Sequence, residues 1–514
     1  MMNSFERVLA VIAPGWALNR LKASFALRLY DAAQPEGVRR KRNDRGSGDA
    51  VMAQAGDKLR IQARYLDENH DLVVGILDTL VNRTVGAGLM PEPQARKKDG
   101  SLHDDYNSFA LDLFQDWSLH PEVTGELTYP MVQRLAARSL FRDGEILAQH
   151  LEGNVKNLDH KTRVPYSIEL IEADLLPFDF NDQGKGIVQG VEISVWGTPN
   201  AYHLLKSHPG DVFFQRKHDV KRVLSESIVH LKHVKRLKQT RGVTILAPVL
   251  GRLEDIKDYE ESERKAAKIA AALAGYVKRT SDYTGTGKSP FAKGNGLGGV
   301  AGGTHRDVSI RPGTMVDNLA VGEEIETFKS NRPNSGLQAF RDSQLRAVAA
   351  GTGTTFSAIA KDYNGNYSSR RQEASESKEP AKAATGHFVG QFDQRIYQRF
   401  IRTAVLSGAL KVPKDIDLQT IYDAEYFPPA MPEIDPNKEA NSRGKNIDIG
   451  VKSQTQSIRE AGGNPRKVLN QIEQERKDHK KRGLKFSTTP EDNEEKKPKK
   501  KKRKKKKRKK KVKN

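Results

Sequence analysis

Apolar residues in the first part of the chain recur every three or four positions, the period that places them on one face of an α-helix. Helices are predicted on this basis over residues 17–31, 49–85, 104–119 and 128–143. Gly86, Gly88 and Pro91 follow the second of these, and such residues commonly end a helix. A linker rich in Arg and Lys separates the first two helices.

The pattern changes after residue 144 to short β-branched or alternating runs, separated by Gly, Pro and Asn turns. Strands are predicted over 145–151, 167–173, 187–195, 201–205 and 227–234. Two more strand candidates, 304–310 and 324–328, lie in a Gly-rich region that spans 281–333. The chain therefore contains a sheet-rich region between helical ones.

The stretch from Arg252 to Arg279 contains no Pro and a single Gly, Gly275, and consists mostly of strong helix formers. Its acidic residues fall early, and Lys278 and Arg279 fall last, as the helix macrodipole favours. A continuous helix of roughly 40 Å is predicted. Its apolar stripe fades through 260–265, so it needs neighbouring helices from this chain or from other copies. An ordinary packed helix of a large domain is an equally open interpretation.

Helical pattern returns over 334–350, with Asn334 or Ser335 as the expected N-cap. The loop GTGTTFSAIAKDYNGNYSS follows, and a further helix starts at about Arg370. The remaining helices are predicted over 385–410 and 438–482, separated by the turn YFPPAMPEIDP. Helices and sheet together place the chain in the α+β class.

The formal net charge of +22 is concentrated at one end of the chain. Residues 496–514 contain 16 Lys or Arg and no acid, so removing these 16 charges from +22 leaves +6 for the rest. Such a segment cannot bury enough apolar surface to fold, and it binds polyanions in a salt-dependent way. A targeting or solubility role is also open for it.

The chain has 514 residues, a length that suggests roughly three domains, and it has no Cys. Disulfides, a thiol nucleophile and Cys-ligated metals are therefore excluded, which fits assembly in a reducing cytoplasm. No apolar run approaches the ~20 residues that a membrane span needs. Pro14, Gly15 and Trp16 interrupt the apolar patch near the N-terminus and no small-residue cleavage site follows, so no signal peptide is predicted.

Two Gly-rich motifs suggest a nucleotide site, but neither has the context that such a site needs. The sequence GTGKS at 285–289 resembles a phosphate loop, yet the position of its first Gly is Asp282 and no hydrophobic strand precedes it. The segment 294–299 matches GxGxxG without a strand before it or a helix after it. Flexible loops are the favoured interpretation.

The titratable residues form no convincing catalytic or metal-binding set. His230 and His233 are three residues apart in a predicted strand, so they point to opposite faces and are interpreted as structural or surface histidines. Glu169 and Glu172 are separated in the same way, and no partner base lies near them or near Asp174. The sequence Asp-Gly-Glu at 143–145 is interpreted as a turn between helix and strand. No catalytic residue, metal or cofactor is predicted.

The loop that begins at Gly351 has a different character. Gly residues give it a pliable backbone, and several Thr and Ser residues make it polar. Lys361, Arg370 and Arg371 add cations beside Tyr363 and Tyr367. Such a segment can contact a phosphate backbone without reading bases. A structured connector between helices is the alternative.

Segments spread over most of the chain resemble, in order, the portal proteins of tailed bacteriophages of the lambda-type family. They include YLDENHDLVVGILDTLVNRTVGAGLMPEP (65–93), YSIELIEADLLP (166–177) and VAAGTGTTFSAIAKDYNGNYSSRRQE (348–373). The most specific pieces are RGVTIL, the DYNGNYSS loop and the IDPNKEA turn, none of which is catalytic.

The resemblance implies a noncatalytic ring of about twelve copies at one vertex of the capsid, assembled in the host cytoplasm, with a channel for double-stranded DNA. The implied partners are the terminase large subunit, the head–tail connector or neck proteins, and the major capsid or scaffold protein, with no membrane. In this family a β-rich wing surrounds a stem of long helices, a small α/β clip faces the packaging motor, and a helical crown faces the capsid interior.

Mapped onto this sequence by segment order, the resemblance divides the chain into eight parts. These are an N-terminal helix and basic linker (1–48), the wing (49–255), a first stem helix (256–280), the clip (281–333), a second stem helix (334–350), the tunnel loop (351–369), wing and crown helices (370–485) and a disordered polybasic tail (486–514).

The tunnel loop projects toward DNA in the family, so the resemblance assigns DNA contact to a set of residues in and just after this loop. They are Thr352, Thr354, Thr355, Phe356, Ser357, Lys361, Tyr363, Asn364, Tyr367, Arg370 and Arg371.

Two features depart from the family pattern. The segment 374–384 is less apolar than expected, and its helix is predicted to break at Pro380. The polybasic tail is also more basic than the family leads us to expect. The alternative function is a non-portal nucleic-acid-binding protein or a nuclease that docks through this tail.

Overall fold

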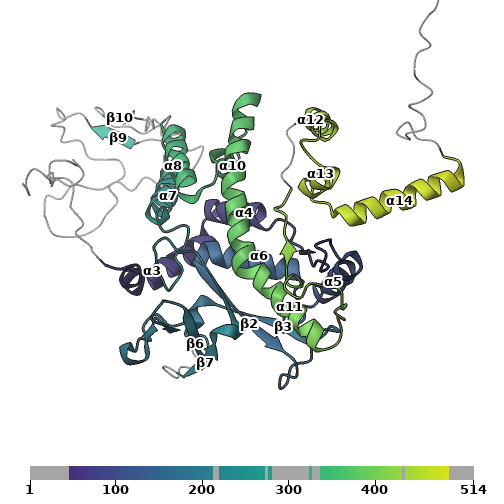
Figure 1. Ribbon diagram of the computed structural model, residues 1–514. Helices are drawn as coiled ribbons and strands as arrows, with labels where there is room; N and C mark the ends of the chain where they lie inside the picture. Colours follow the sequence, from purple (N-terminus) through teal and green to yellow (C-terminus); the bar gives the residue numbers. More distant parts are fainter. Residues whose placement is uncertain are drawn as a thin grey trace, which may run out of the picture.

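The computed structural model describes residues 46–211, 219–272, 276–279, 323–326, 336–430 and 435–484 (Figure 1). The helix predicted at 17–31, the strand candidate at 304–310, the two Gly-rich motifs and the polybasic tail lie outside these residues. The described residues form a mixture of helices and antiparallel sheets, which confirms the α+β class.

The N-terminal helical pattern forms α3 (Gly48–Asn69), α4 (Asp71–Thr84), α5 (Asp104–Trp117) and α6 (Tyr129–Asp143). The stretch predicted as one helix over 49–85 is therefore two helices. They are separated because His70 takes an extended backbone conformation between them, with φ −136° and ψ 110°.

The sheet-rich region contains two antiparallel sheets. The three-stranded sheet has the order β3-β2-β8, with β2 at Glu145–Glu152, β3 at Tyr166–Ile171 and β8 at Ile228–Lys232. The four-stranded sheet has the order β4-β5-β6-β7, with bounds Ile187–Val188, Val191–Ile193, Pro199–Leu205 and Val220–Leu224. The strand predicted over 187–195 is a hairpin, because Gln189 and Gly190 turn the chain with φ of 50° and 82°. The sequence pattern missed β7.

An aromatic cluster joins the helices to the three-stranded sheet. Trp117 of α5 stacks on Tyr166 of β3 with ring centroids 5.3 Å apart, and its indole N–H donates to the Tyr166 carbonyl at 2.8 Å. Phe114, Tyr129 and Phe400 pack around this pair, and all five side chains are fully buried or nearly so. Phe400 belongs to α11 (Gln394–Leu406), so residues nearly 300 positions apart complete one core.

Gly144 connects α6 to β2, as the turn prediction for 143–145 requires. Its φ of +91° lies in the left-handed region, and a Cβ at this position would meet the Val243 carbonyl carbon at 2.4 Å. Glycine is therefore needed both for the backbone conformation and for the close approach of residues 243–244.

Glu145, directly after this glycine, is the centre of a buried ionic cluster that the sequence did not predict. Its Oε1 accepts hydrogen bonds from Arg60 Nη2 and Arg241 Nε, each at 2.8 Å, and its Oε2 lies 3.0 Å from His230 Nε2. Burial acts to raise the pKa of Glu145, but the positive charge of Arg241 and the hydrogen bond with His230 hold it well below its usual range. Arg241 also lies over the Phe178 ring at 4.0 Å.

Asp143, on the other side of Gly144, extends this charged cluster toward the surface. It accepts two hydrogen bonds from Arg64, at 2.9 and 3.0 Å, and two from Arg142, both at 2.9 Å. The two carboxylates that flank the turn therefore pin α3 and the 241–243 segment to the α6–β2 junction. A turn was the correct interpretation, but its acidic residues have a structural role that their spacing did not reveal.

The rod predicted over 252–279 is shorter than expected. It is α7, which spans Leu250–Ala272, and Tyr276–Arg279 instead forms strand β9, antiparallel to β10 at Glu323–Glu326. Helix propensity is overridden here because a strand partner 44 residues further along the chain supplies the hydrogen bonds. The strand predicted at 324–328 is thus confirmed as a strand, and its bounds differ from the prediction by one or two residues.

Helix α8 (Leu337–Thr352) lies beside α7 (Figure 1). Tyr259 and Phe340 meet edge-on at 5.1 Å, and Arg341 Nε donates to Glu260 Oε1 at 2.6 Å. The helix begins at Leu337 instead of the predicted 334, and its N-cap is Gly336 rather than Asn334 or Ser335. Glu260 lies where the apolar stripe of the rod fades, so an ion pair replaces apolar packing there.

Helix α10 (Tyr367–Phe388) runs through Pro380, so the predicted break is wrong. A π-helical turn at Val389–Asp393 then joins it to α11. The C-terminal described part contains α12 (Pro436–Asp448), α13 (Gln454–Glu460) and α14 (Pro465–Arg482). Arg459 joins α13 to the small β1–β11 sheet (Glu92–Pro93 with Ala424–Glu425) through two hydrogen bonds to Glu92, at 3.1 and 2.6 Å.

Candidate nucleic-acid-facing segment

The loop predicted over 351–369 divides into two halves with opposite environments. Helix α8 extends to Thr352, and a short helix, α9 (Phe356–Ala360), occupies the middle of the predicted loop. The first half packs onto the core, whereas residues 361 and 363–372 are all exposed. We call residues 352–360 the anchor and residues 361–371 the exposed segment.

Threonines and backbone groups fix the start of the anchor. The Thr352 and Thr354 hydroxyls lie 2.8 Å apart, and both side chains are buried. The Thr352 hydroxyl also donates to the Val348 carbonyl at 2.9 Å. Gly353 between them has φ +69° and ends α8. These two threonines satisfy each other inside the protein and offer nothing to an external ligand.

The rest of the anchor is tied to α4 and α10. Thr355 accepts a hydrogen bond from Arg83 of α4 at 3.1 Å. The Ser357 hydroxyl and backbone N–H both donate to the Glu373 carboxylate of α10, at 2.6 and 3.1 Å. Phe356 is half-buried, with the Arg346 guanidinium 4.9 Å from its ring centroid. Burial lowers the pKa of Arg83, partly offset by the charge of Glu373.

The exposed segment carries the cations of the predicted site. Lys361 ends α9 with φ +53°, and Arg370 and Arg371 lie in the first turns of α10. All three side chains are exposed, and within the part of the chain that the structure describes none of them forms an ion pair. Their positive charge is therefore available to an anion.

The aromatic and amide residues of the exposed segment also face solvent. Tyr363 is 58% exposed and Tyr367 is 45% exposed. Asn364 donates its backbone N–H to Asp362 at 2.9 Å, which shapes the turn, and its side chain remains exposed. Lys438 of α12 lies 5.3 Å from the Tyr367 ring centroid and pairs with Asp435 at 3.0 Å, so this neighbouring cation already has a counter-charge.

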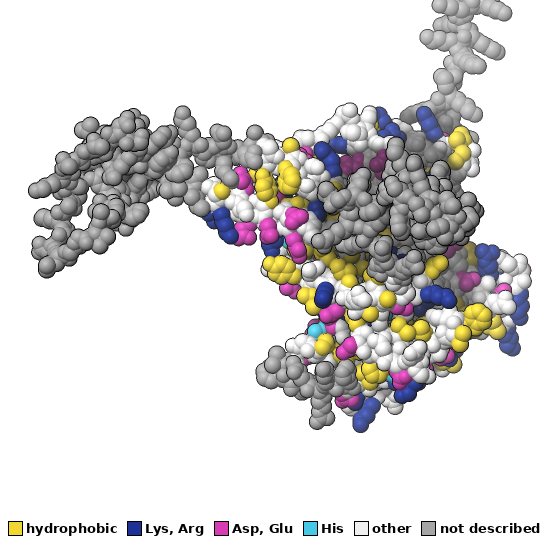
Figure 2. Space-filling model, turned by 90° about the vertical axis from the view of Figure 1, so that its left-hand side faces the viewer, with side chains coloured by type: hydrophobic (Ala, Val, Ile, Leu, Met, Phe, Trp, Pro, Cys, Tyr) yellow, Lys and Arg dark blue, Asp and Glu magenta, His cyan; other side chains and the backbone are white. Residues whose placement is uncertain are grey.

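The remaining body shows no single-sign field on the face drawn in Figure 2, where basic and acidic side chains are interspersed. This agrees with a net charge of only +6 outside the polybasic tail, obtained by removing the tail's 16 charges from +22. The described surface thus combines a nearly neutral body with a local run of unpaired cations in the exposed segment.

The two histidines considered for metal binding have structural partners. His230 contacts Glu145 in the buried cluster, and burial lowers its pKa despite that carboxylate. His233 lies 3.0 Å from the Val243 carbonyl through Nδ1, and burial lowers its pKa as well. The His233 contact holds Val243 beside the end of β8, whereas the His230 contact joins β8 to β2. His233 follows Lys232, the last residue of β8, so the opposite-face argument from strand spacing does not apply to this pair.

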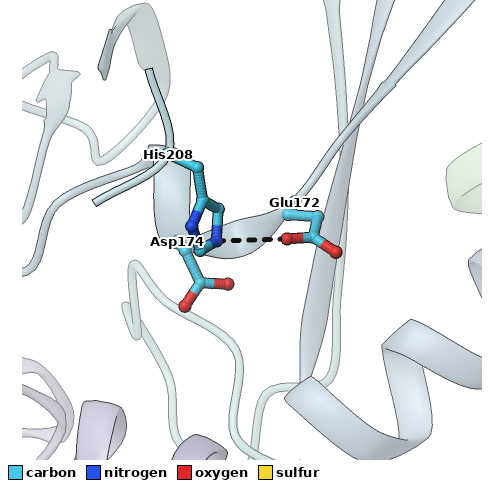
Figure 3. Close-up of side chains that lie close together, drawn as sticks. All are labelled: Glu172, Asp174 and His208. Carbon is cyan, nitrogen blue, oxygen red and sulfur yellow. Dashed lines mark ion pairs between the residues drawn. The ribbon is translucent and has the colours of Figure 1, made fainter. Parts of the chain in front are cut away.

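Glu172, Asp174 and His208 form a group of potential metal ligands within the described residues (Figure 3). His208 Nε2 lies 3.3 Å from Glu172, and its Nδ1 accepts a hydrogen bond from the Gly210 N–H at 3.1 Å. That bond places the proton of a neutral ring on Nε2, which then presents N–H rather than a lone pair to the group. Asp174 is already paired with Arg64, so the geometry favours an ion-pair cluster over a metal site.

Comparison with known proteins identifies the family of the chain. Residues 36–383 match the family model described as phage portal protein, lambda family. This range includes both sheets, α7, α8, the anchor and the exposed segment. The chain belongs to the lambda family of phage portal proteins. The resemblance inferred from the sequence is therefore confirmed.

A curated relative and several solved structures share this similarity. The chain is 24% identical over 451 residues to a probable portal protein of Halomonas phage phiHAP-1, covering 86% of this chain and 84% of the relative. It also matches chains in the neck of a native gene transfer agent particle computed with C12 symmetry and in the virion of a native gene transfer agent particle. These two are each 12% identical, with TM-scores of 0.39 and 0.41, covering 84% and 86% of this chain and 94% and 98% of theirs.

No helix in the described part of the chain combines the length and apolar character that crossing a bilayer requires. The described helices of this portal protein instead pack against the sheets, against one another, or present charged faces to solvent.

Proposed function

We propose that this portal protein assembles into a ring of twelve copies at one capsid vertex, and that the ring forms the channel through which double-stranded DNA enters and leaves. The family match carries this proposal, since it covers the residues from α3 to the second half of α10. The α7–α8 pair supports it, because α7 is long and, among its side chains that the structure describes, only Leu250, Leu253 and Ile256 are buried. Neighbouring copies supply the packing that α7 lacks.

The exposed segment is the DNA-facing part of this channel in our proposal. Lys361, Arg370 and Arg371 contact phosphates without regard to sequence, since phosphate contacts carry no base information. The anchor holds the segment in place through Arg83 and Glu373. A nearly neutral body lets DNA slide, because tight binding along the whole channel would oppose translocation.

The ring docks the terminase large subunit and later the neck or tail proteins, and it contacts the major capsid or scaffold protein. Phage portal proteins are structural, and we propose that this chain has no ATPase or nuclease activity of its own. Purified ring should therefore show neither activity above background in ATP-hydrolysis and Mg²⁺-dependent cleavage assays. A turnover number that disappears on substitution of this chain's own residues would support the nuclease alternative instead.

Electron microscopy of negatively stained particles, combined with native mass measurement, tests the assembly. The expected result is a ring with a central hole and a mass of about twelve copies. Monomers alone, under conditions in which the chain is folded, would contradict the proposal. A ring with another copy number would retain the function and correct the stoichiometry.

A further inference from the structure

Asp393 is a fully buried carboxyl group at the junction between α10 and α11. It ends the π-helical turn at Val389–Asp393, in which the Gln394 N–H bonds to the Val389 carbonyl, five residues earlier. Turns of this kind are rare and are frequently found at functional sites. This one lies at the base of the helix whose other end carries Arg370 and Arg371.

The hydrogen bonds to Asp393 leave one of its oxygens unsatisfied. Oδ1 accepts from the Tyr129 hydroxyl at 2.7 Å and from Gln133 Nε2 at 2.8 Å, both on α6. Oδ2 has no partner among the described residues. An ionised carboxylate can accept about four hydrogen bonds, so two neutral donors on one oxygen solvate its charge poorly. The protonated acid fits this site better than the carboxylate.

The same polar cluster is connected to the elements that hold the anchor. Gln133 also exchanges two hydrogen bonds with the Leu89 backbone, each at 2.9 Å, in the turn that follows α4. The Thr385 hydroxyl of α10 donates to the Thr84 carbonyl at the end of α4, next to Arg83, which binds the anchor. A change at Asp393 therefore acts directly on the contact between α10, α6 and α4.

Other titratable groups around the junction provide no compensating positive charge. Tyr426 donates to the Asp393 carbonyl at 3.2 Å, and its own pKa is raised well above normal by burial and by Asp393. On β8, which packs against the π turn, His230 faces Glu145 and Lys232 donates to the carbonyls of residues 239 and 240. His387 of α10 contacts the Lys232 carbonyl, and Arg395 of α11 contacts Gln391. The Tyr397 hydroxyl is buried without a hydrogen-bond partner among the described residues, and burial raises its pKa, so it is neutral.

We propose that the α10–α11 junction is a proton-linked hinge, in which loss of the Asp393 proton loosens the packing of α10 and repositions the exposed segment. Burial raises the pKa of Asp393 to about 7, against the hydrogen bonds from Gln133 and Tyr129 that act to lower it. Ionisation then favours an opened junction in which Oδ2 reaches water. The inference rests on the proposed function only in taking DNA as the ligand of the exposed segment.

Hydrogen–deuterium exchange of the full-length protein, assembled or not, tests the hinge. After correction for the intrinsic pH dependence of exchange, protection of amides 385–397 should fall roughly 10-fold between pH 6 and pH 8, as expected for a carboxyl with a pKa near 7 when closed and near 4 when open. Asp393→Asn should remove this dependence. Asp112→Asn, at an exposed position of α5, should leave it unchanged.

Tyr129→Phe distinguishes titration of Asp393 from a purely structural role of this carboxyl group. It removes a hydrogen bond that stabilises the carboxylate, so the midpoint of the pH dependence should shift to higher pH. If Asp393→Asn does not fold, pH-difference infrared spectra of the unmodified protein and of Tyr129→Phe still report the protonated carboxyl band and its midpoint. Protection that is independent of pH, or a pH dependence that persists unchanged in Asp393→Asn, would overturn the proposal.

The absence of Cys allows the exposed segment to be labelled at a single site. Spin labels on Ser368→Cys in assembled rings should give inter-copy distances that change between pH 6 and 8 and stay constant in the Asp393→Asn background. Unchanged distances in a protein whose junction does show pH-dependent exchange would refute the repositioning. Failure to form rings at all would count against the portal proposal, since the exchange experiment tests the junction in either case.

Discussion

Two groups of arginines in this protein use the same side chain in opposite ways. Arg60 and Arg241 are fully or almost fully buried and form ion pairs with Glu145. Arg370 and Arg371 are exposed and make no ion pair within the described part of the chain. The first group fixes the connection between helices and sheet, and the second is available to bind phosphate. The presence of a buried partner carboxylate, rather than the type of cation, distinguishes the structural arginines from those that we propose to contact DNA.

The largest expected effect is that of Glu145→Gln. It leaves Arg241 buried without an ion-pair partner and Arg60 with only Asp174, 3.9 Å away. Breaking a buried ion pair from one side costs roughly 3–5 kcal/mol. Urea unfolding followed by circular dichroism should show this loss as a lower midpoint. A midpoint near that of the unmodified protein would show that the buried group is no more important for stability than the exposed one.

The buried polar groups also predict sensitivity to acid. His150 lies 2.7 Å from the Tyr166 hydroxyl through Nδ1, and burial, followed by the charges of Arg399 and Arg395, lowers the pKa of His150 to about 3. The unfolded chain binds a proton at this histidine at higher pH than the folded protein does. The free energy of unfolding therefore keeps its full value above pH 6.5 and decreases as the pH falls from 6.5 toward 3. The loss by pH 4 is about 3 kcal/mol.

His150→Gln should flatten this part of the stability profile, measured as the urea midpoint from pH 7 to 4. The matched control is His120→Gln, at an exposed position after α5. An unchanged slope in His150→Gln would mean that another group dominates acid unfolding.

Removing the exposed cations should weaken DNA binding and leave the stability of the fold unchanged. Replacing Lys361, Arg370 and Arg371 by Ala should change the free energy of unfolding by less than about 0.5 kcal/mol. The slope of log affinity against log salt for duplex DNA should fall by about 0.9 for each phosphate contact that the ring loses. Fluorescence anisotropy on rings lacking the polybasic tail provides the measurement.

The control for this triple variant replaces Arg402, Lys411 and Lys414, which are also exposed cations, by Ala. It alters net charge equally but lies outside the exposed segment. Equal salt slopes in the two variants would show that overall charge, and not the position of the cations in the exposed segment, determines DNA binding.

The smallest expected effect concerns an ion pair at the surface of the four-stranded sheet. Arg222 and Glu192 form two hydrogen bonds, at 2.9 and 3.1 Å, in water. Such pairs contribute little because solvent screens them. Glu192→Gln should leave the urea midpoint unchanged within error, and a clear decrease would show that geometry at the surface can substitute for burial.

The sequence predicted elements whose signals are local. The helix at 104–119 and the strand at 145–151 have regular periods and clear boundaries, and α5 and β2 confirm them. Local signals failed for Tyr276–Arg279, where a distant strand overrides helix propensity. They also failed at Pro380, an exposed position of α10, where water can bond the carbonyl that the missing N–H leaves free.

The candidate site was only partly predictable for a similar reason. The loop's polar residues were visible, but the residues that anchor it are not neighbours in the sequence. Arg83 lies 272 positions before Thr355, and Glu373 lies 16 positions after Ser357. Nothing in the spacing of Thr352 and Thr354 showed that these two would bind each other instead of facing outward.

The continuity of α10 has a mechanical consequence. Its 22 residues form a rigid strut of about 33 Å, with cations at the solvent end and Phe388 in the aromatic core at the other. In the proposed DNA channel, a force that the duplex exerts on Arg370 would be transmitted along α10 to the interior of the subunit. Friction against the DNA would then load the subunits of the ring rather than a flexible loop.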